Sequence, residues 1–211
     1  MLARRAQPFP LGEPLWHKKG VMALTRGRRI LPQLNDNSLQ ELALRYAGKY
    51  ATTRAKLRAY LARKVRERGW DGTREPDLEA LAGRFAELGY IDDAAYALSK
   101  SRALTGRGYG KRRLADKLRR DGVDEADGAA ARAHADGQAV AAALRFAERR
   151  RLGPFAVAAP EPKQRGKWIA AMVRAGHDLT LARAIAQLAP GAEIDVDGLG
   201  ERANCEATNL H

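Results

Sequence analysis

The chain has 211 residues, of which 38 are lysine or arginine and 25 are aspartate or glutamate, so its formal net charge is +13. Such a charge favours a polyanionic partner, and the single cysteine, Cys205, excludes a disulfide framework or a cysteine-based zinc site within one chain. Aromatic residues make up only 6% of the chain, which argues against a base-stacking platform of the usual kind.

Residues 1–37 show no helical periodicity and contain four prolines and seven basic residues. We interpret this segment as a flexible basic arm. Met22 lies within it and is an alternative candidate for the start of translation. The segment lacks the apolar core of a signal peptide, and no apolar run in the chain approaches the length of a membrane span. We therefore expect a cytoplasmic protein with no membrane contact.

Residues 38–91 are predicted to form a first unit of three helices. Ser38 and Glu41 have the spacing of a capping box at the start of the first helix. Thr52 or Thr53 can cap the second, and the third starts near Asp77. Apolar residues recur at intervals of three or four in each helix, and glycines at positions 48, 69 and 89 follow them.

Residues 92–137 are predicted to form a second three-helix unit. Asp92 or Asp93 can cap its first helix, and a glycine-rich stretch at positions 106–110 ends that helix. A very basic helix follows over positions 111–120, with Leu114 and Leu118 as its apolar residues. The third helix is the alanine-rich stretch after Asp124.

A third unit is predicted over residues 138–190, with prolines interrupting the connection after its first helix. The prediction of three units is supported by one pattern, in which two large apolar residues four apart are followed by glycine and then aspartate. It recurs at Leu61, Val65, Gly69 and Asp71, at Leu114, Leu118, Gly122 and Asp124, and at Trp168, Met172, Gly176 and Asp178.

The predicted fold is therefore all-α, with about nine helices in three tandem three-helix repeats. Each unit is too small to bury a full core alone, so we expect the units to stack into an elongated, curved, solenoid-like array. Residues 191–211 are acidic and lack periodicity, and we interpret them as a disordered tail.

Catalytic and cofactor chemistry is not indicated by the sequence. The four histidines have no partner at metal-ligand spacing, so we expect no metal site and no cofactor. The stretch from Gly106 to Lys111 fails the phosphate-loop pattern, because Thr105 stands where the first glycine is needed and Arg112 where serine or threonine is needed. We interpret it as a loop joining two helices, whose backbone amides could still contact a phosphate. Asp92 and Asp93 are explained better by capping than by a nuclease site.

The basic residues are the main functional indication. Nine basic residues and one acidic residue, Asp116, lie between positions 100 and 120. A solvated helix normally mixes the two signs, so this helix is either an ordinary basic face over a small core or a surface for phosphates or an acidic partner. The candidate binding residues are Arg54, Lys56, Arg58, Arg102, Arg107, Tyr109, Lys111, Arg112, Arg113, Lys117, Arg119 and Arg120.

These residues also carry a family resemblance. FAELGYIDDAAYA followed by SRALTGRGYGKRRLADKLRRDGVDE resembles the signature of RecX regulatory proteins. ALRYAGKYATTRAKLRAYLARK resembles the first repeat of that family, and AAMVRAGHDLTLARAI resembles the third. The resemblance covers about residues 38–188, and the chain departs from the family in its long N-terminal arm and its proline-interrupted third unit.

The resemblance implies tandem three-helix repeats and a non-enzymatic regulator. RecX proteins bind the filament of the RecA recombinase on DNA, several bind DNA directly, and they restrain ATP hydrolysis, strand exchange, coprotease activity and the SOS response. The expected partners are thus the RecA filament and single- and double-stranded DNA, and we expect a monomer. The alternative is a helical repeat protein that binds nucleic acid without sequence preference and has no recombinase partner.

Overall fold

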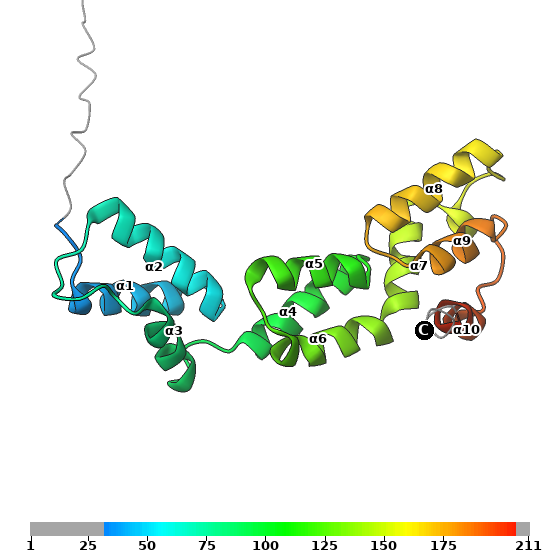
Figure 1. Cartoon of the computed structure of the whole chain (residues 1–211). Helices are drawn as coiled ribbons and strands as arrows, with labels where there is room; N and C mark the ends of the chain where they lie inside the picture. Colours follow the sequence, from blue (N-terminus) through cyan, green and yellow to red (C-terminus); the bar gives the residue numbers. More distant parts are fainter. Residues whose placement is uncertain (1–31, 206–211) are drawn as a thin grey trace, which may run out of the picture. The chain divides into compact units, whose positions relative to one another are not determined.

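The structure is a computed structural model that describes residues 32–205 (Figure 1). Within that range it contains ten α-helices and one short 3₁₀ helix, η1. Their bounds are α1 Asp36–Lys49, α2 Arg54–Arg68, α3 Leu78–Glu87, α4 Asp93–Gly106, α5 Lys111–Asp121, α6 Glu125–Gly137, α7 Ala139–Arg150, η1 Gly153–Phe155, α8 Pro162–Arg174, α9 Leu179–Gln187 and α10 Val196–Cys205. Over the described residues no helix is long and apolar enough to cross a membrane.

Helices α1 to α3 share one hydrophobic core, which includes Leu39, Leu57, Leu61 and Phe85. The helix starts follow local capping chemistry, since Thr53 caps α2 and Asp77 caps α3 through their side-chain oxygens.

The predicted start of α1 at Ser38 is wrong. Asn35 is the N-cap, and Ser38 occupies the third helical position, where its side chain completes a capping box with Asn35. Leu34 is fully buried in the first core and pairs with Trp70 in an isolated β-bridge. The predicted arm of residues 1–37 is therefore wrong for residues 34–37, which belong to the folded unit, and residues 1–31 lie outside the described part of the chain.

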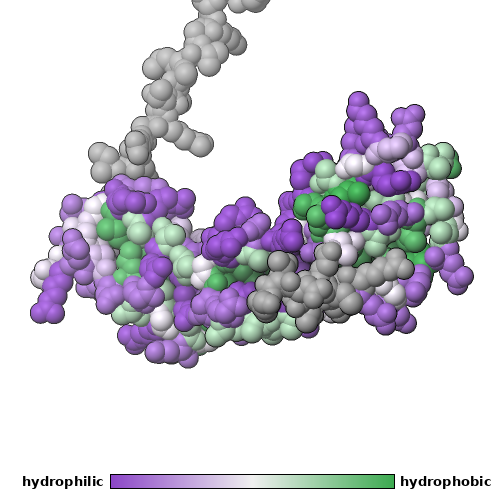
Figure 2. Space-filling model, turned by 45° about the vertical axis from the view of Figure 1, so that its right-hand side comes forward, coloured by the Kyte–Doolittle hydropathy of each residue, from purple (hydrophilic) through white to green (hydrophobic). Residues whose placement is uncertain are grey.

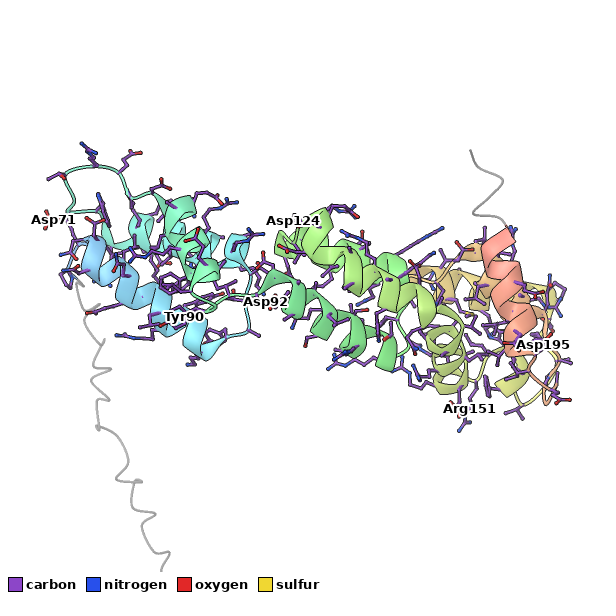
Figure 3. All side chains as sticks on the ribbon, turned by 90° about the horizontal axis from the view of Figure 1, so that it is seen from below. Asp71, Tyr90, Asp92, Asp124, Arg151 and Asp195 are labelled. Atoms are coloured by element: carbon purple, nitrogen blue, oxygen red, sulfur yellow. The ribbon has the colours of Figure 1, made fainter. Side chains whose placement is uncertain are left out.

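Helices α4, α5 and α6 form a second group with a core of its own. Asp92, and not Asp93, caps α4, while Asp124 caps α6. Figure 3 shows Asp92 and Asp124 at the neighbouring starts of these two helices. The core is narrow because α6 contributes small residues such as Ala131 and Ala135, which let α4 and α6 pack closely.

Helices α7 to α10 form a third group around Phe146, Trp168, Met172 and Ile185. The prediction of a disordered tail from residue 191 is wrong for residues 196–205, because these form α10, which contacts α9 and α7. Leu199 of α10 is buried in the third core. One well-placed leucine in an acidic stretch anchors the helix without producing a visible apolar period.

The repeated pattern identifies equivalent structural positions. Gly69, Gly122 and Gly176 all have positive φ, as expected for glycines that end a helix. Asp124 and Asp178 cap the helices that follow, as predicted. Asp71 does not, since a longer connection separates it from α3 and Asp77 takes that role. The all-α repeat arrangement is thus confirmed, and the elongated shape of the array remains a prediction.

Candidate functional site

The start of α2 meets the end of α5 through a buried polar cluster. The hydroxyl of Thr53, which is fully buried, donates a hydrogen bond of 2.6 Å to the backbone carbonyl of Asp121. The buried carboxylate of Asp121 accepts hydrogen bonds from the hydroxyl of Tyr96, at 2.7 Å, and from the ammonium of Lys117, at 2.8 Å. Lys56 lies 4.0 Å from the same carboxylate. These groups satisfy one another and join the first and second repeats.

This cluster shifts two pKa values. Burial would raise the pKa of Asp121, but the hydrogen bonds from Lys117 and Tyr96 and the charge of Lys56 hold it below its ordinary value. Burial, together with the hydrogen bond to Asp121, raises the pKa of Tyr96 far above its ordinary value. At neutral pH the carboxylate is therefore charged and the phenol is not.

Arg54, at the first turn of α2, contacts three carboxylates of the second repeat. Its Nε lies 3.2 Å from the nearly buried Asp93, and its terminal nitrogen lies 3.1 Å from Asp124 and 2.7 Å from Asp127. The side-chain hydrogen bond to Asp93 is the main reason that the pKa of Arg54 is raised. Asp93 also accepts a hydrogen bond from the backbone amide of Arg54. Arg54 is thus neutralised within the protein and joins two repeats.

The glycine-rich stretch joins the second repeat to the third. The backbone amide of Gly110 donates to the carbonyl of Ala175, at 3.0 Å, and the amide of Arg112 donates to the carbonyl of Gly176, at 3.1 Å. A Cβ atom at Gly110 would lie 2.2 Å from the Gly176 oxygen, so only glycine allows this approach. The interpretation as a joining loop fits this geometry. Of the amides considered for phosphate contact, that of Gly110 is thus already occupied by a carbonyl group of the third repeat, as is the amide of Arg112 just after the stretch.

His177 lies at the same junction, with only 2% of its surface exposed. Its Nε2 is 3.1 Å from the carbonyl oxygen of Gly108, so this nitrogen carries the proton and donates. Burial lowers the pKa of His177, and the hydrogen bond offsets only part of that effect. The imidazole is therefore neutral near pH 7 and serves the packing of two repeats.

The basic residues of α5 are less free than the sequence indicates, because four of them have acidic partners, two on other segments and two on the helix itself. Lys111 pairs with Asp136 of α6, Arg112 with Asp178 before α9, and Lys117 with Asp121. Arg119 pairs with Asp116 on the helix itself. The excess of positive charge on the helix is thus partly compensated, both by its own two carboxylates and by carboxylates of neighbouring elements.

The candidate residues consequently divide into three kinds. Arg54, Lys56 and Lys117 belong to the joint between the first two repeats, as described above. Five cations of α5 are exposed at its surface: Lys111, Arg112, Arg113, Arg119 and Arg120. The guanidinium of Arg113 lies 4.2 Å from the centre of the Tyr109 ring.

The remaining candidates lie on other elements. Arg102 and Arg107 are exposed on α4 and just after it. Within residues 32–205 neither has an acidic partner. Arg58 lies on α2 and pairs with Glu79 of α3. The twelve candidate residues therefore do not form one continuous patch in the structure.

Two features were missed at the level of sequence. Arg145 of α7 donates a hydrogen bond of 3.3 Å to the backbone carbonyl of Thr105 and so lies beside the basic end of α4. Tyr46 and Tyr60 stack between α1 and α2 with basic residues around them. Neither feature could be predicted from the sequence of a single helix, because each joins residues of two helices.

Hydrophilic residues cover most of the face seen in Figure 2, and hydrophobic residues show between them. Among residues 32–205 no group of three or more histidine, cysteine, aspartate or glutamate side chains is placed to hold a metal ion. The arrangement offers charged surfaces and polar joints, which suit binding to a macromolecule.

Comparison with known proteins gives a consistent result, although no family model matches the chain. It is 30% identical over 177 residues to the regulatory protein RecX of Myxococcus xanthus, covering 80% of this chain and 92% of that protein. It is 41% identical over 88 residues to the regulatory protein RecX of a Mycobacterium species (strain KMS), covering 46% of that protein. A crystal structure of a regulatory protein RecX superposes with a TM-score of 0.50 at 20% identity, over 72% of each chain, and this likeness supports the fold alone.

Proposed function

The chain belongs to the RecX family of regulatory proteins, and from that membership we propose that it binds filaments of the RecA recombinase on DNA and restrains them. The observation that carries the proposal is the similarity to the Myxococcus xanthus protein over nearly its whole length. The expected effects are inhibition of ATP hydrolysis, strand exchange and coprotease activity, and so control of recombination, DNA repair and the SOS response. The protein acts without chemistry of its own, in the cytoplasm where its partners are.

The surface proposed for this contact is the exposed side of α5 with the neighbouring end of α4. It comprises Lys111, Arg112, Arg113, Arg119 and Arg120, together with Arg102, Arg107 and Tyr109. The ion pairs on this surface are exposed, so they contribute little and are exchanged readily for phosphates or acidic side chains. Arg54, Lys56 and Lys117 act indirectly. Arg54 and Lys56 tie α2 to carboxylates of the second repeat, and Lys117 holds the Asp121 carboxylate that Lys56 meets.

The test is RecA-dependent ATP hydrolysis on single-stranded DNA, with increasing amounts of this protein. A triple variant with alanine at Arg113, Arg119 and Arg120 should stay folded and inhibit less. These side chains are exposed, and their charged groups lie against residues of the second repeat, those of Arg119 and Arg120 at Asp116 and that of Arg113 at Tyr109. The matched control has alanine at three exposed arginines on other elements, Arg74, Arg84 and Arg183, and should inhibit as the wild type does. An equal loss of inhibition in both variants would indicate that inhibition depends on the total charge of the protein and not on the α5 surface.

The alternative function is binding to nucleic acid without a recombinase partner, since exposed cations serve that purpose equally well. A binding experiment separates the two. At a salt concentration that abolishes binding to naked DNA, the wild type should still bind a recombinase filament. Filament binding that disappears together with DNA binding would overturn the proposal and favour the alternative.

A further inference from the structure

Three tyrosines gather between α1 and α2, which lie side by side in Figure 1. The rings of Tyr46 and Tyr60 stack with centres 4.2 Å apart and planes within 15° of each other. Tyr50, one helical turn after Tyr46, is tilted by 51° with its ring centre 5.3 Å away. The three rings thus form a continuous aromatic surface built from two helices.

Core packing explains two of these rings but not the third. Tyr46 and Tyr60 are partly buried and pack against the core of the first repeat. Tyr50 is 50% exposed and is not part of that core. None of the three hydroxyls makes a hydrogen bond with another described residue. A half-exposed ring held at the edge of a stacked pair offers its free surface to a ligand.

The same surface is strongly basic. Arg45, Lys49, Arg63 and Lys64 line a hollow of about 470 Å³ together with the three tyrosines. Glu67 is the acidic partner of two of these cations, at 2.6 Å from Lys64 and 3.6 Å from Arg63. Arg45 is exposed without an acidic partner in the described part of the chain, and the ammonium of Lys49 lies 5.4 Å from the centre of the Tyr50 ring.

Four cations around one aromatic surface match a particular ligand chemistry. Cations pair with phosphates along a backbone, while an exposed ring stacks on a base of any sequence. In a duplex the base faces are covered by neighbouring base pairs, so a ring on the protein surface reaches them only in a single strand. An acidic peptide would use the cations and leave the ring face unused.

We propose that the hollow between α1 and α2, defined by Arg45, Tyr46, Lys49, Tyr50, Tyr60, Arg63 and Lys64, binds single-stranded DNA by stacking a base on Tyr50. The inference deepens the proposed function and rests on it, because action on a recombinase filament requires the protein to lie against DNA. The tyrosine surface supplies a preference for single strands, and the cations supply affinity without sequence preference.

The test measures binding of a short fluorescent thymidine oligonucleotide to the full chain by anisotropy. Replacing Tyr50 with alanine should weaken binding by about 5- to 150-fold, the range found for the loss of one stacked base. The dependence of the binding constant on salt should stay the same, because no charge is removed. Tyr50→Phe should bind as the wild type does, because the ring is retained.

The matched control is Tyr90→Ala. Tyr90 is 52% exposed, lies in the connection between α3 and α4 (Figure 3) and does not line this hollow, although it lines a second one that Tyr50 also borders. It should leave single-strand binding unchanged. A second control uses an oligonucleotide with abasic sites in place of bases. On that strand the wild type and Tyr50→Ala should bind equally, because nothing remains to stack.

Three results would overturn the proposal. Tyr50→Ala could bind the thymidine strand as tightly as the wild type, or it could lose the same factor on duplex or abasic DNA. In the third case, an acidic peptide would displace the strand while Tyr50→Ala had no effect, and the hollow would then be a protein-binding site. Recombinase ATPase inhibition is measured in parallel. If the wild type inhibits ATP hydrolysis but Tyr50→Ala binds the single strand normally, this site alone is refuted. If the wild type fails to inhibit, the proposed function is refuted.

Discussion

Gly110 offers a direct test of how the second and third repeats are joined. Its φ of −82° and ψ of 169° are ordinary for any residue, so alanine there introduces no backbone strain. The added methyl carbon would lie 2.2 Å from the carbonyl oxygen of Gly176 and 2.4 Å from the backbone nitrogen of His177. Backbone atoms cannot rotate away as a side chain can, so the two repeats must separate slightly.

Overpacking of this kind costs about 1–3 kcal/mol of unfolding free energy. In a protein of this size each kcal/mol corresponds to a fall in melting temperature of about 2–4 °C. Gly110→Ala should therefore melt several degrees below the wild type. The hydrogen bonds from Gly110 and Arg112 to the third repeat should also weaken, which hydrogen exchange at these two amides would detect.

Gly166→Ala is the matched control. Gly166 lies inside α8, and a Cβ atom there would have nothing within 4 Å. Alanine should stabilise this helix by about 0.5–1 kcal/mol, because glycine loses more backbone entropy on folding. The two substitutions add the same methyl group and should shift the melting temperature in opposite directions. Thermal unfolding followed by circular dichroism tests this, and an unchanged melting temperature for Gly110→Ala would refute the reasoning.

Two further predictions concern buried groups at the joints. Because the pKa of His177 is lowered in the folded state, the unfolded chain takes up the proton first as pH falls below about 6.5. The contribution of His177 to the free energy of unfolding should thus be complete above that pH and decline below it. Urea unfolding should show a smaller decline for His177→Gln than for the wild type. Equal declines would contradict a buried, neutral imidazole at this position. Lys117→Ala should cost about 1–2 kcal/mol because it removes a partner of the buried Asp121 carboxylate. Arg119→Ala, on the same helix and fully at the surface, should change stability by less than about 0.5 kcal/mol, and equal urea midpoints for both variants would count against the buried cluster.

Most helix starts were predictable because capping is local. Thr53, Asp77, Asp124 and Asp178 each bond a backbone amide two or three residues ahead, so a short window of sequence contains the whole interaction. Ser38 shows the limit of this reasoning. Serine followed by glutamate at the right spacing fits a capping box, but Asn35 forms one with Ser38 and starts the helix earlier.

The roles of the basic residues could not be predicted, because their partners are distant in sequence. One terminal nitrogen of Arg54 meets both Asp124 and Asp127, about seventy residues away, and Arg112 meets Asp178 across 66 positions. A count of charges within α5 therefore overstated how many of them are free. The family resemblance indicated the proposed partner, but it gave no distinction between cations that join repeats and cations at the surface.

The tyrosine surface illustrates the same point for aromatic residues. A low overall aromatic content argued against base stacking, yet stacking depends on where the rings lie. Tyr46 and Tyr60 belong to different helices, and only the packing of α1 on α2 brings their rings together. Composition describes an average over the chain, whereas one exposed ring among cations is enough to contact one base.

The distribution of charge gives a physical argument for the two proposed contact surfaces. Residues 1–31 contain seven basic residues and one acidic residue, so they contribute nearly half of the formal charge of +13. Long-range attraction to a polyanion thus does not require the folded repeats, and it cannot distinguish a single strand, a duplex and a protein filament. That distinction needs groups held in fixed positions. The repeats supply them, since the hydrogen bond from Thr53 to the carbonyl of Asp121 and the ion pair between Lys56 and the Asp121 carboxylate join α2 to α5. Each proposed contact surface includes one of these two helices.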